Sequence, residues 1–408
     1  MVARDHFLGR HYDAVHSAGP FKSLNPTKRY LVADRTPAEP PSGKKDGSTQ
    51  QRPKEPPHFK AAYVWRSRDN RKGRHAVAVD RDPRKHPSAK GPKPSNTWEQ
   101  TLRGVTKMFL RYPVWDISYD VAVVFTIGSV IWVVNGFFSW LPVEDPSSEF
   151  SGETTWAAGL TALIGATVFE FGSVLLMLEA VNENRADCFG WAVEESVDGA
   201  LHLHKDHDCR HSHAQKSFLV QGASDSDGQP DTSSSTPPEP TRMWSWWPTW
   251  YELKTHYFKE VGFLACFSQM VGATIFWISG ITALPPILNN LSTAATNGVY
   301  WVPQVVGGTG FIVSSALFMI EVQPRWYIPA PGVLGWHIGL WNFIGAIGFT
   351  LCGALGFAIS QPGFEYAVTL STYIGSWAFL IGSTIQWFES LNKYPIWVDD
   401  KVGSLTTA

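Results

Sequence analysis

The chain has 408 residues, of which 44% are hydrophobic and 17% charged, with a formal net charge of -2. The mean hydropathy of -0.11 averages two unlike kinds of sequence, because six apolar runs carry most of the hydrophobicity. Each run approaches the ~20 residues that cross a bilayer, which excludes an ordinary soluble protein. We therefore expect an all-α polytopic protein whose six transmembrane helices lie at about 118–141, 157–181, 261–284, 300–322, 334–358 and 369–391.

Residues 1–95 are rich in Pro, Lys, Arg, Gly and Ser and show no apolar periodicity, which predicts a disordered basic cytosolic tail. Of the 34 Lys and Arg residues, 24 lie in residues 1–112. Such a tail is suited to anionic lipid headgroups or to a cytosolic protein, but its dilute charge favours a solvated tail that only satisfies the topology. Residues 96–112 predict an interfacial helix, with apolar side chains on one face and bases on the other.

The apolar runs repeat one pattern three times, which predicts three tandem helical hairpins at 113–182, 261–324 and 325–392. In the first helix of each hairpin, an aromatic residue follows a Gly by four positions. In the second helix, Phe follows Gly by four, and Glu follows that Phe by ten. Small residues at this spacing let helices approach closely in lipid. The matching aromatic residues are Trp132, Phe169, Phe276, Phe311, Phe349 and Phe379.

The segment 183–260 predicts a cytosolic insertion with a disordered middle and a dense group of metal-ligating side chains. Imidazole and thiolate are the usual ligands of zinc and copper, so specific binding of either metal is one interpretation. The alternating spacing matches no zinc-finger pattern, and weak surface affinity or no role is the other interpretation. The candidate ligands are His202, His204, His207, Cys209, His211 and His213.

The bases fall on one side of a six-helix topology, which predicts that both termini and the tail at 393–408 are cytosolic. Asn290 begins a glycosylation sequon in the third inter-helix loop, on the predicted lumenal side. Four cysteines exclude a disulfide framework, and residues 1–23 contain no continuous apolar segment of the signal-peptide type. We expect a membrane of the secretory pathway, the vacuole or the cell surface.

Glu170 is the one acid near the middle of a predicted span, where an ionised carboxylate costs at least ~2.5–3.5 kcal/mol. It must be neutral, paired, or exposed to a wet cavity. Its candidate partners are Gln269, His337 and Asn342. A proton-coupled or ion-binding site and a protonated Glu with one inter-helix hydrogen bond explain it equally well.

The repeated Glu179, Glu321 and Glu389 lie at the predicted cytosolic ends of the even spans. A carboxylate at a helix C-terminus opposes the helix dipole, so its threefold recurrence favours a structural bond to a group of a neighbouring hairpin. A ring of three acids around a cytosolic vestibule is the alternative.

The third hairpin, with Phe349, Gly353 and the segment 374–383 (IGSWAFLIGS), resembles the two-helix YrhK-type membrane module. The whole chain, including the segment 188–191 (CFGW) before the Cys/His-rich stretch, resembles fungal multi-pass membrane proteins built from that module. The resemblance covers residues 97–397 and implies no settled activity.

The chain contains no Walker loop, no Ser nucleophile elbow, no His-Glu-x-x-His motif and no paired carboxylates within a span. We therefore expect a non-enzymatic membrane protein, organising or sensing, whose cytosolic segments bind a partner or a metal. The bilayer is its expected environment, and we expect no nucleic-acid partner. The alternative is a transporter or channel that uses a polar intramembrane site around Glu170.

Overall fold

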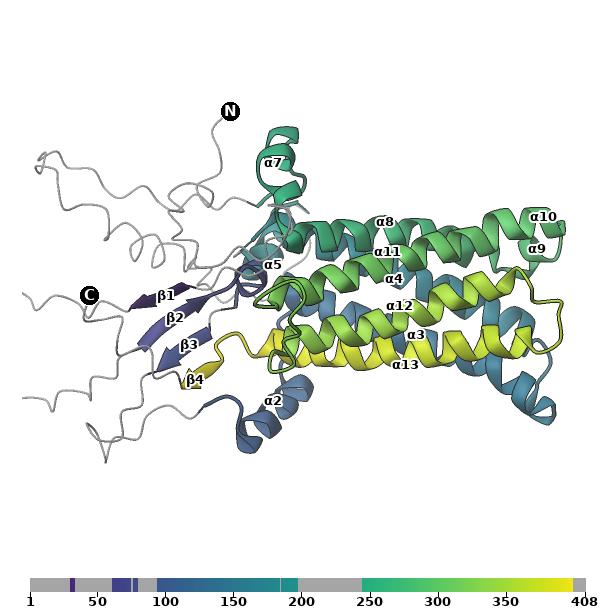
Figure 1. The fold of residues 1–408 in the computed structure, drawn as a ribbon, viewed down its shortest axis with the longest axis horizontal. Coiled ribbons are helices and arrows are strands. Elements are labelled where there is room, and N and C mark those ends of the chain that lie inside the picture. Colours follow the sequence, from purple (N-terminus) through teal and green to yellow (C-terminus); the bar gives the residue numbers. More distant parts are fainter. Residues whose placement is uncertain are drawn as a thin grey trace, which may run out of the picture.

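The computed structural model describes residues 30–33, 61–74, 76–79, 94–183, 185–196 and 244–398. It confirms the predicted fold class, because six helices are long and apolar enough to cross a membrane. These helices dominate the ribbon in Figure 1. Their bounds are α3 Ile117–Glu144, α4 Ala158–Val181, α8 Val261–Thr282, α11 Val302–Val322, α12 Leu334–Gly356 and α13 Phe364–Leu391.

The remaining elements are short and lie at the two ends of the six-helix bundle. One turn of π-helix precedes α4 (Glu153–Ala157) and another precedes α11 (Asn297–Trp301), at matching places in the first two hairpins. The short helices are α1 Ser67–Arg71, α2 Trp98–Leu110, α5 Phe189–Ser196, α7 Trp250–Thr255, α9 Pro285–Leu288 and α10 Thr293–Thr296. The strands are β1 Tyr30–Ala33, β2 Ala61–Trp65, β3 Ala76–Val79 and β4 Ile396–Val398.

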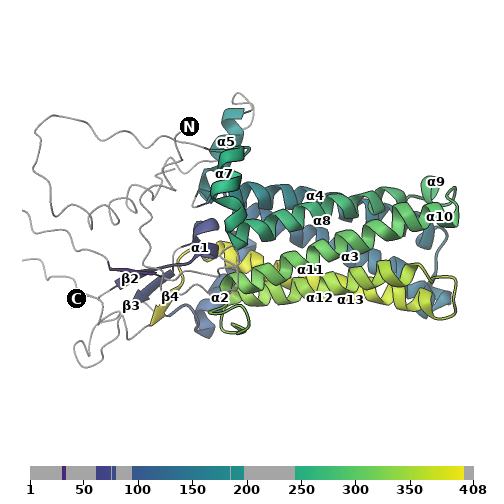
Figure 2. The ribbon, with the colours of Figure 1, turned by 45° about the horizontal axis from the view of Figure 1, so that its top comes forward.

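The six long helices form a closed ring. Each packs against its neighbours in the sequence, in the order α3, α4, α8, α11, α12, α13, and α13 packs against α3 to close the ring. The strands and α2 lie at one end of the bundle, whereas α9 and α10 lie at the other (Figure 1). Helix α1 lies at the same end as the strands (Figure 2). We call the end with the strands the terminal end, and the end with α9 and α10, where the helical hairpins turn, the hairpin end.

The axis of the ring is filled by six buried aromatic side chains, one from each helix, which we call the aromatic core. Trp132, Phe276 and Phe349 form one triangle, with ring centroids 4.9–5.7 Å apart. The second layer comes from α4, α11 and α13, where Phe379 lies 5.6 Å from Phe169 and 6.3 Å from Phe311. The glycines four residues before these aromatic side chains leave space for them: a Cβ on Gly128 would meet the ring of Phe169, and one on Gly165 the ring of Trp132. At Gly272 the close neighbour is the backbone of α11, so the two helices approach closely there.

A β-hairpin lies at the terminal end, and the connection between its two strands lies between the ends of the long helices. Strands β2 and β3 pair antiparallel, and β3 pairs in parallel with β4, which follows α13. Residues 66–74, which we call the finger, connect β2 to β3 and include α1, four of whose five residues are buried. Figure 2 shows α1 between the strands and the ends of the long helices.

The packing of the finger differs from the predicted disordered tail over residues 1–95. That prediction fails for residues 66–74, which are packed against all three hairpins. The physical reason is charge complementarity: the finger buries bases beside carboxylates, so it needs no apolar periodicity of its own.

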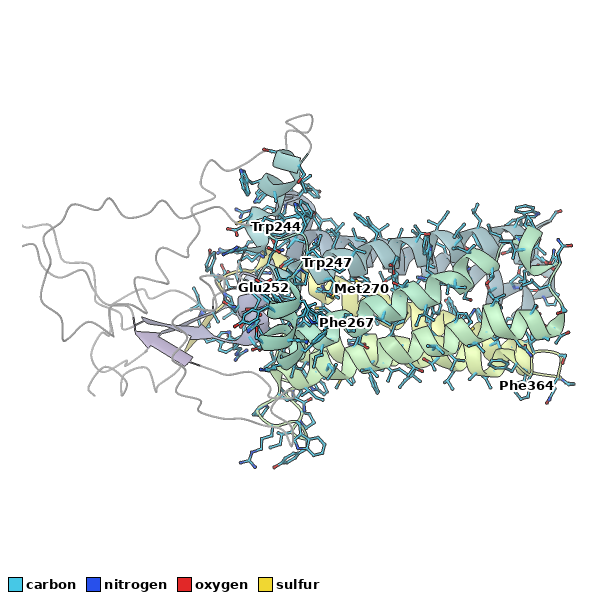
Figure 3. All side chains as sticks on the ribbon, turned by 90° about the horizontal axis from the view of Figure 1, so that it is seen from above. Trp244, Trp247, Glu252, Phe267, Met270 and Phe364 are labelled. Carbon is cyan, nitrogen blue, oxygen red and sulfur yellow. The ribbon has the colours of Figure 1, made fainter. Side chains whose placement is uncertain are left out.

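Helix α2 occupies the predicted interfacial segment and lies beside the terminal end of α13. Gly104 packs against Phe388, and the ring of Phe109 lies 6.5 Å from that of Trp387. The opposite face of α2 leaves Trp98 and other apolar side chains exposed. Exposed Trp247 lies at the same end of the molecule (Figure 3), so this end carries the amphipathic groups that suit a membrane surface.

Candidate functional site: a carboxylate ring and its basic finger

Glu179, Glu321 and Glu389 lie in the last turns of α4, α11 and α13 at the terminal end, each at most 1% exposed. We call them the carboxylate ring. All three lie at the same position of the hairpin pattern, which explains why one short segment contacts all of them. Each carboxylate also lies among the unpaired carbonyl groups of a helix C-terminus, where a negative charge is unfavourable unless a cation offsets it.

Arg71 joins two hairpins through the carboxylate ring. Its Nη2 lies 2.7 Å from Glu321 Oε2, and its Nη1 lies 3.3 Å from Glu179 Oε2. Arg68 binds the third hairpin, with Nη2 2.7 Å from Glu389 Oε2. Both guanidinium groups are buried, and such pairs are short, charge-assisted hydrogen bonds. The finger therefore cross-links the three hairpins at one level.

Two further bases of the finger complete the site. Arg74 Nη1 lies 2.9 Å from Glu389 Oε1 and 3.3 Å from Asp69. Lys72 lies between two hairpins, with Nζ 3.7 Å from Glu179 and 3.9 Å from Glu389. Four bases thus meet four acids in this buried network, so its formal charges balance.

The first helix of each hairpin (α3, α8 and α12) has a small residue in its first turn, which leaves space for the finger. Ser118, Gly262 and Gly335 share one position of the hairpin pattern, ten residues before the Gly of the aromatic core. The Ser118 hydroxyl donates to Glu179. A Cβ on Gly262 would lie 2.3 Å from Glu321 Oε1, and a Cβ on Gly335 would lie 2.5 Å from Arg68 Nε. Small residues are therefore required where the ionic groups occupy the space.

Burial and the carboxylates act in opposite directions on the bases. Burial alone would lower the pKa of Arg68 and Arg71, but Glu389 and Glu321 outweigh it and raise both pKa values. At Lys72 burial prevails over the attraction of Glu179 and Glu389, and the pKa is lowered. The carboxylates therefore favour the charged form of Arg68 and Arg71, whereas burial disfavours the charged form of Lys72.

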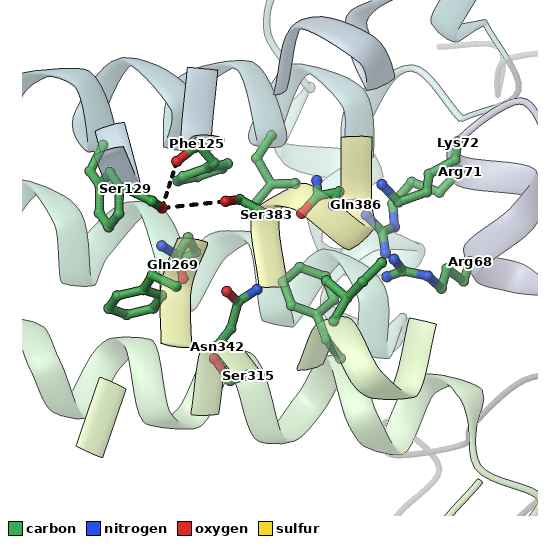
Figure 4. A pocket seen from close by; sticks show the side chains of 15 residues that line it. Arg68, Arg71, Lys72, Phe125, Ser129, Gln269, Ser315, Asn342, Ser383 and Gln386 are labelled. Atoms are coloured by element: carbon green, nitrogen blue, oxygen red, sulfur yellow. Dashed lines mark hydrogen bonds between the residues drawn. The ribbon is translucent and has the colours of Figure 1, made fainter. Parts of the chain in front are cut away.

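A cavity of about 40 Å³, lined by both apolar and polar side chains, lies between the finger and the aromatic core. We call it the axial cavity. Arg68, Arg71 and Lys72 line one end, and Phe169 and Phe379 of the aromatic core line the other. Its walls carry polar side chains from five of the long helices: Ser129, Gln269, Ser315, Asn342, Ser383 and Gln386. Figure 4 shows them converging on the axis.

The four polar residues predicted to form an intramembrane site do not come together. Gln269 and Asn342 both line the axial cavity. Glu170 lies outside it, in the α4–α8 contact, where it accepts a 3.0 Å hydrogen bond from exposed Thr274. His337 is near the terminal end of α12, with Nε2 2.7 Å from the carbonyl of Pro331. Sequence spacing could not separate them, because it does not show which helix face points inward.

The other predicted site residues divide between described and undescribed segments. The six candidate metal ligands at 202–213 lie outside the described residues. Asn290 is exposed in the connection between α9 and α10 at the hairpin end, and its amide donates a 2.9 Å hydrogen bond to Pro286. Its exposure leaves the sequon sterically accessible.

The bases of the finger are the site residues that sequence analysis missed. They lie in a segment whose overall composition predicts disorder. One signal was present: Arg68, Arg71 and Lys72 have the spacing that places three side chains on one face of a helix. The threefold recurrence of an acid at helix C-termini, where it needs a cation, was the complementary signal.

Comparison with known proteins identifies no relative. No family model, no curated protein and no solved structure matches the chain. Its site is therefore interpreted from its own geometry, and the resemblance to the YrhK-type module remains an expectation.

Proposed function

We propose that this integral membrane protein is non-enzymatic and organises or senses, with cytosolic segments that bind a partner or a metal. In this proposal the six-helix ring is a rigid membrane unit. The finger ties that unit to the extramembrane segments, because β3 and β4 join the finger to the end of α13 in one small sheet. Displacement of the sheet would thus act directly on the carboxylate ring.

The observation that carries the proposal is the packing of the ring axis. The aromatic core fills the middle of the axis, and the finger with the carboxylate ring fills its terminal end. The space between them is only about 40 Å³. This favours a structural unit over a path for solutes, because one water already needs roughly 10–15 Å³ of such space.

The alternative is a transporter or channel that uses Glu170. One observation favours it: Glu170 Oε2 is buried and makes no hydrogen bond within the described part of the chain. A buried carboxyl oxygen without a hydrogen bond lowers the stability of the bundle. Such a group within a membrane span is therefore a candidate for a functional role. In this reading the α4–α8 contact would open to admit a proton or a small ion.

Flux measurements on the full chain in liposomes separate the two functions. We expect proton, potassium and chloride flux equal to that of empty vesicles, both for the wild type and for Glu170→Gln. Gln keeps an acceptor for Thr274, so this substitution should leave the fold intact. Saturable flux that falls in Glu170→Gln would overturn the structural proposal and establish the alternative.

The sensing part of the proposal places zinc or copper at His202, His204, His207, Cys209, His211 and His213. We expect purified protein to bind about one equivalent of metal with sub-micromolar affinity, because several imidazoles and a thiolate chelate together. A variant with all six residues replaced should lose this metal, as measured by elemental analysis and titration. Equal metal content in the two proteins would remove the cluster as a site.

The remaining parts of the proposal concern orientation and origin. The positive charge of residues 1–112 supports a cytosolic terminal end in a secretory, vacuolar or cell-surface membrane. The same charge supports contact with anionic headgroups or with a cytosolic protein. The hairpin pattern supports a YrhK-like, fungal origin. Attachment of glycan at Asn290, tested by glycosidase digestion, would confirm the orientation.

A further inference from the structure

The axial cavity contains hydrogen-bonding groups that the protein itself does not use. Gln269 on α8, Asn342 on α12 and Gln386 on α13 line it, and among the described residues their side-chain amides have no hydrogen-bond partner. Almost all buried polar groups in proteins are satisfied by protein or by a bound species, because an unsatisfied one costs about 1–3 kcal/mol. Gln386 is buried and Gln269 and Asn342 are half-buried, so three amides that face one small space indicate an occupant.

Lys72 supplies a basic group to the same space. Its side chain is 2% exposed, and its Nζ has no hydrogen-bond partner within the described residues. Glu179 and Glu389 are too distant for hydrogen bonds, at 3.7 and 3.9 Å, and both already bind other groups. A buried ammonium without a hydrogen bond is unfavourable, so Lys72 also requires an occupant within its reach.

The charged groups of the cavity wall indicate whether the occupant carries a positive or a negative charge. Arg68, Arg71 and Lys72 are its only charged lining residues among those described, and the carboxylate ring does not line it. The remaining polar lining consists of amides and hydroxyls, all of which can donate. Arg68 and Arg71 are already paired with the carboxylate ring, whereas Lys72 Nζ makes no hydrogen bond within the described residues. Lys72 can therefore donate a charge-assisted hydrogen bond to an anion, which a cation could not accept.

The size of the cavity limits the occupant further. About 40 Å³ accommodates on the order of three waters. Phe125, Phe169 and Phe379 close the space on its apolar sides, so no extended molecule fits. A single halide-sized ion with at most one water matches both the volume and the mixed polar and aromatic wall.

We propose that the axial cavity binds one small inorganic anion, of the size of chloride, held by Lys72 and by the amides of Gln269, Asn342 and Gln386. Figure 4 shows Gln269 and Asn342 toward the inner end of this space and Lys72 toward the finger, with Gln386 between them. The anion is a bound component of the ring, and the aromatic core separates it from the hairpin end. The proposal does not depend on the function proposed above.

Bromide, which mimics chloride and scatters anomalously, is the probe. The full chain is crystallised in sodium bromide, and its thermal unfolding is followed at constant ionic strength as gluconate is replaced by bromide. We expect an anomalous peak within hydrogen-bonding distance of Lys72 Nζ and at least two of the amides. We also expect the unfolding temperature to rise steadily with bromide concentration, because a ligand that binds only the folded state stabilises it.

Matched variants localise the effect. Gln269→Met keeps the length of the side chain but removes its donor, and we expect about tenfold weaker apparent affinity for bromide. Asn342→Leu serves as a second variant if the first fails to fold. Thr274→Val, also on α8 but outside the cavity, should respond to bromide as the wild type does. Waters in the cavity without an anomalous peak, or equal bromide responses in Gln269→Met and Thr274→Val, would overturn the proposal.

Discussion

Replacing Arg71 with Met should destabilise the protein by about 3–5 kcal/mol, the cost typical of removing one partner of a buried ion pair. Arg71 contacts Glu321 at 2.7 Å and Glu179 at 3.3 Å. Its loss would leave both carboxylates at helix C-termini without their guanidinium partner. The measurement is the midpoint of thermal unfolding in detergent, together with hydrogen exchange of residues 66–74, which should become faster as the finger leaves the ring.

Arg103→Met is the matched control for this experiment. Arg103 also pairs with a glutamate at 2.7 Å, but both side chains are largely exposed on α2. Exposed pairs contribute about 0–1 kcal/mol, so the midpoint should hardly change. Combining Arg71→Met with Glu321→Gln should restore part of the lost stability, because the uncompensated charge is removed. Equal effects of Arg71→Met and Arg103→Met would show that the finger is not docked in the ring.

Replacing Gly272 with Ala should separate α8 from α11 and destabilise the bundle by about 2–3 kcal/mol, the upper range for overpacking. A Cβ at this position would lie 2.8 Å from the carbonyl oxygen of Gly307 and 3.2 Å from the Cα of Gly310. Both are backbone atoms, so neither can yield without movement of a helix. Thermal unfolding of the purified protein measures the effect.

Gly332→Ala provides the control, because a Cβ there meets no atom within 4 Å. An added methyl at an open surface position should change the free energy of unfolding by less than about 0.5 kcal/mol. A wild-type midpoint for Gly272→Ala would contradict the close approach of the α8 and α11 backbones.

Much of the membrane domain could be predicted because its signals are local. Apolar runs of sufficient length fix the spans, and the predicted segment 334–358 differs from α12 (Leu334–Gly356) by only two residues. The Gly-to-aromatic spacing also placed the aromatic residues at one repeated position. Phe276 and Phe349, from different hairpins, do meet, at 5.7 Å between ring centroids.

The candidate site could be predicted only in part because its groups come from distant parts of the chain. The sequence indicated that Glu179, Glu321 and Glu389 share a position and need compensation. It did not indicate that the cations come from a segment more than 100 residues away, as with Arg71 and Glu179. Composition predicts disorder for that segment, because it contains too few apolar residues to form a core alone.

The sequence by itself thus determined the number of spans, their lengths and their threefold pattern, since crossing a bilayer and packing helices in it are constraints on short stretches of chain. Only the tertiary structure decided that the ring closes between α3 and α13 and that Gln269 faces the axis whereas Glu170 does not. It also decided that the finger enters the ring. The direction in which a helix face points, and the partner of a buried charge, depend on the positions of all six helices together.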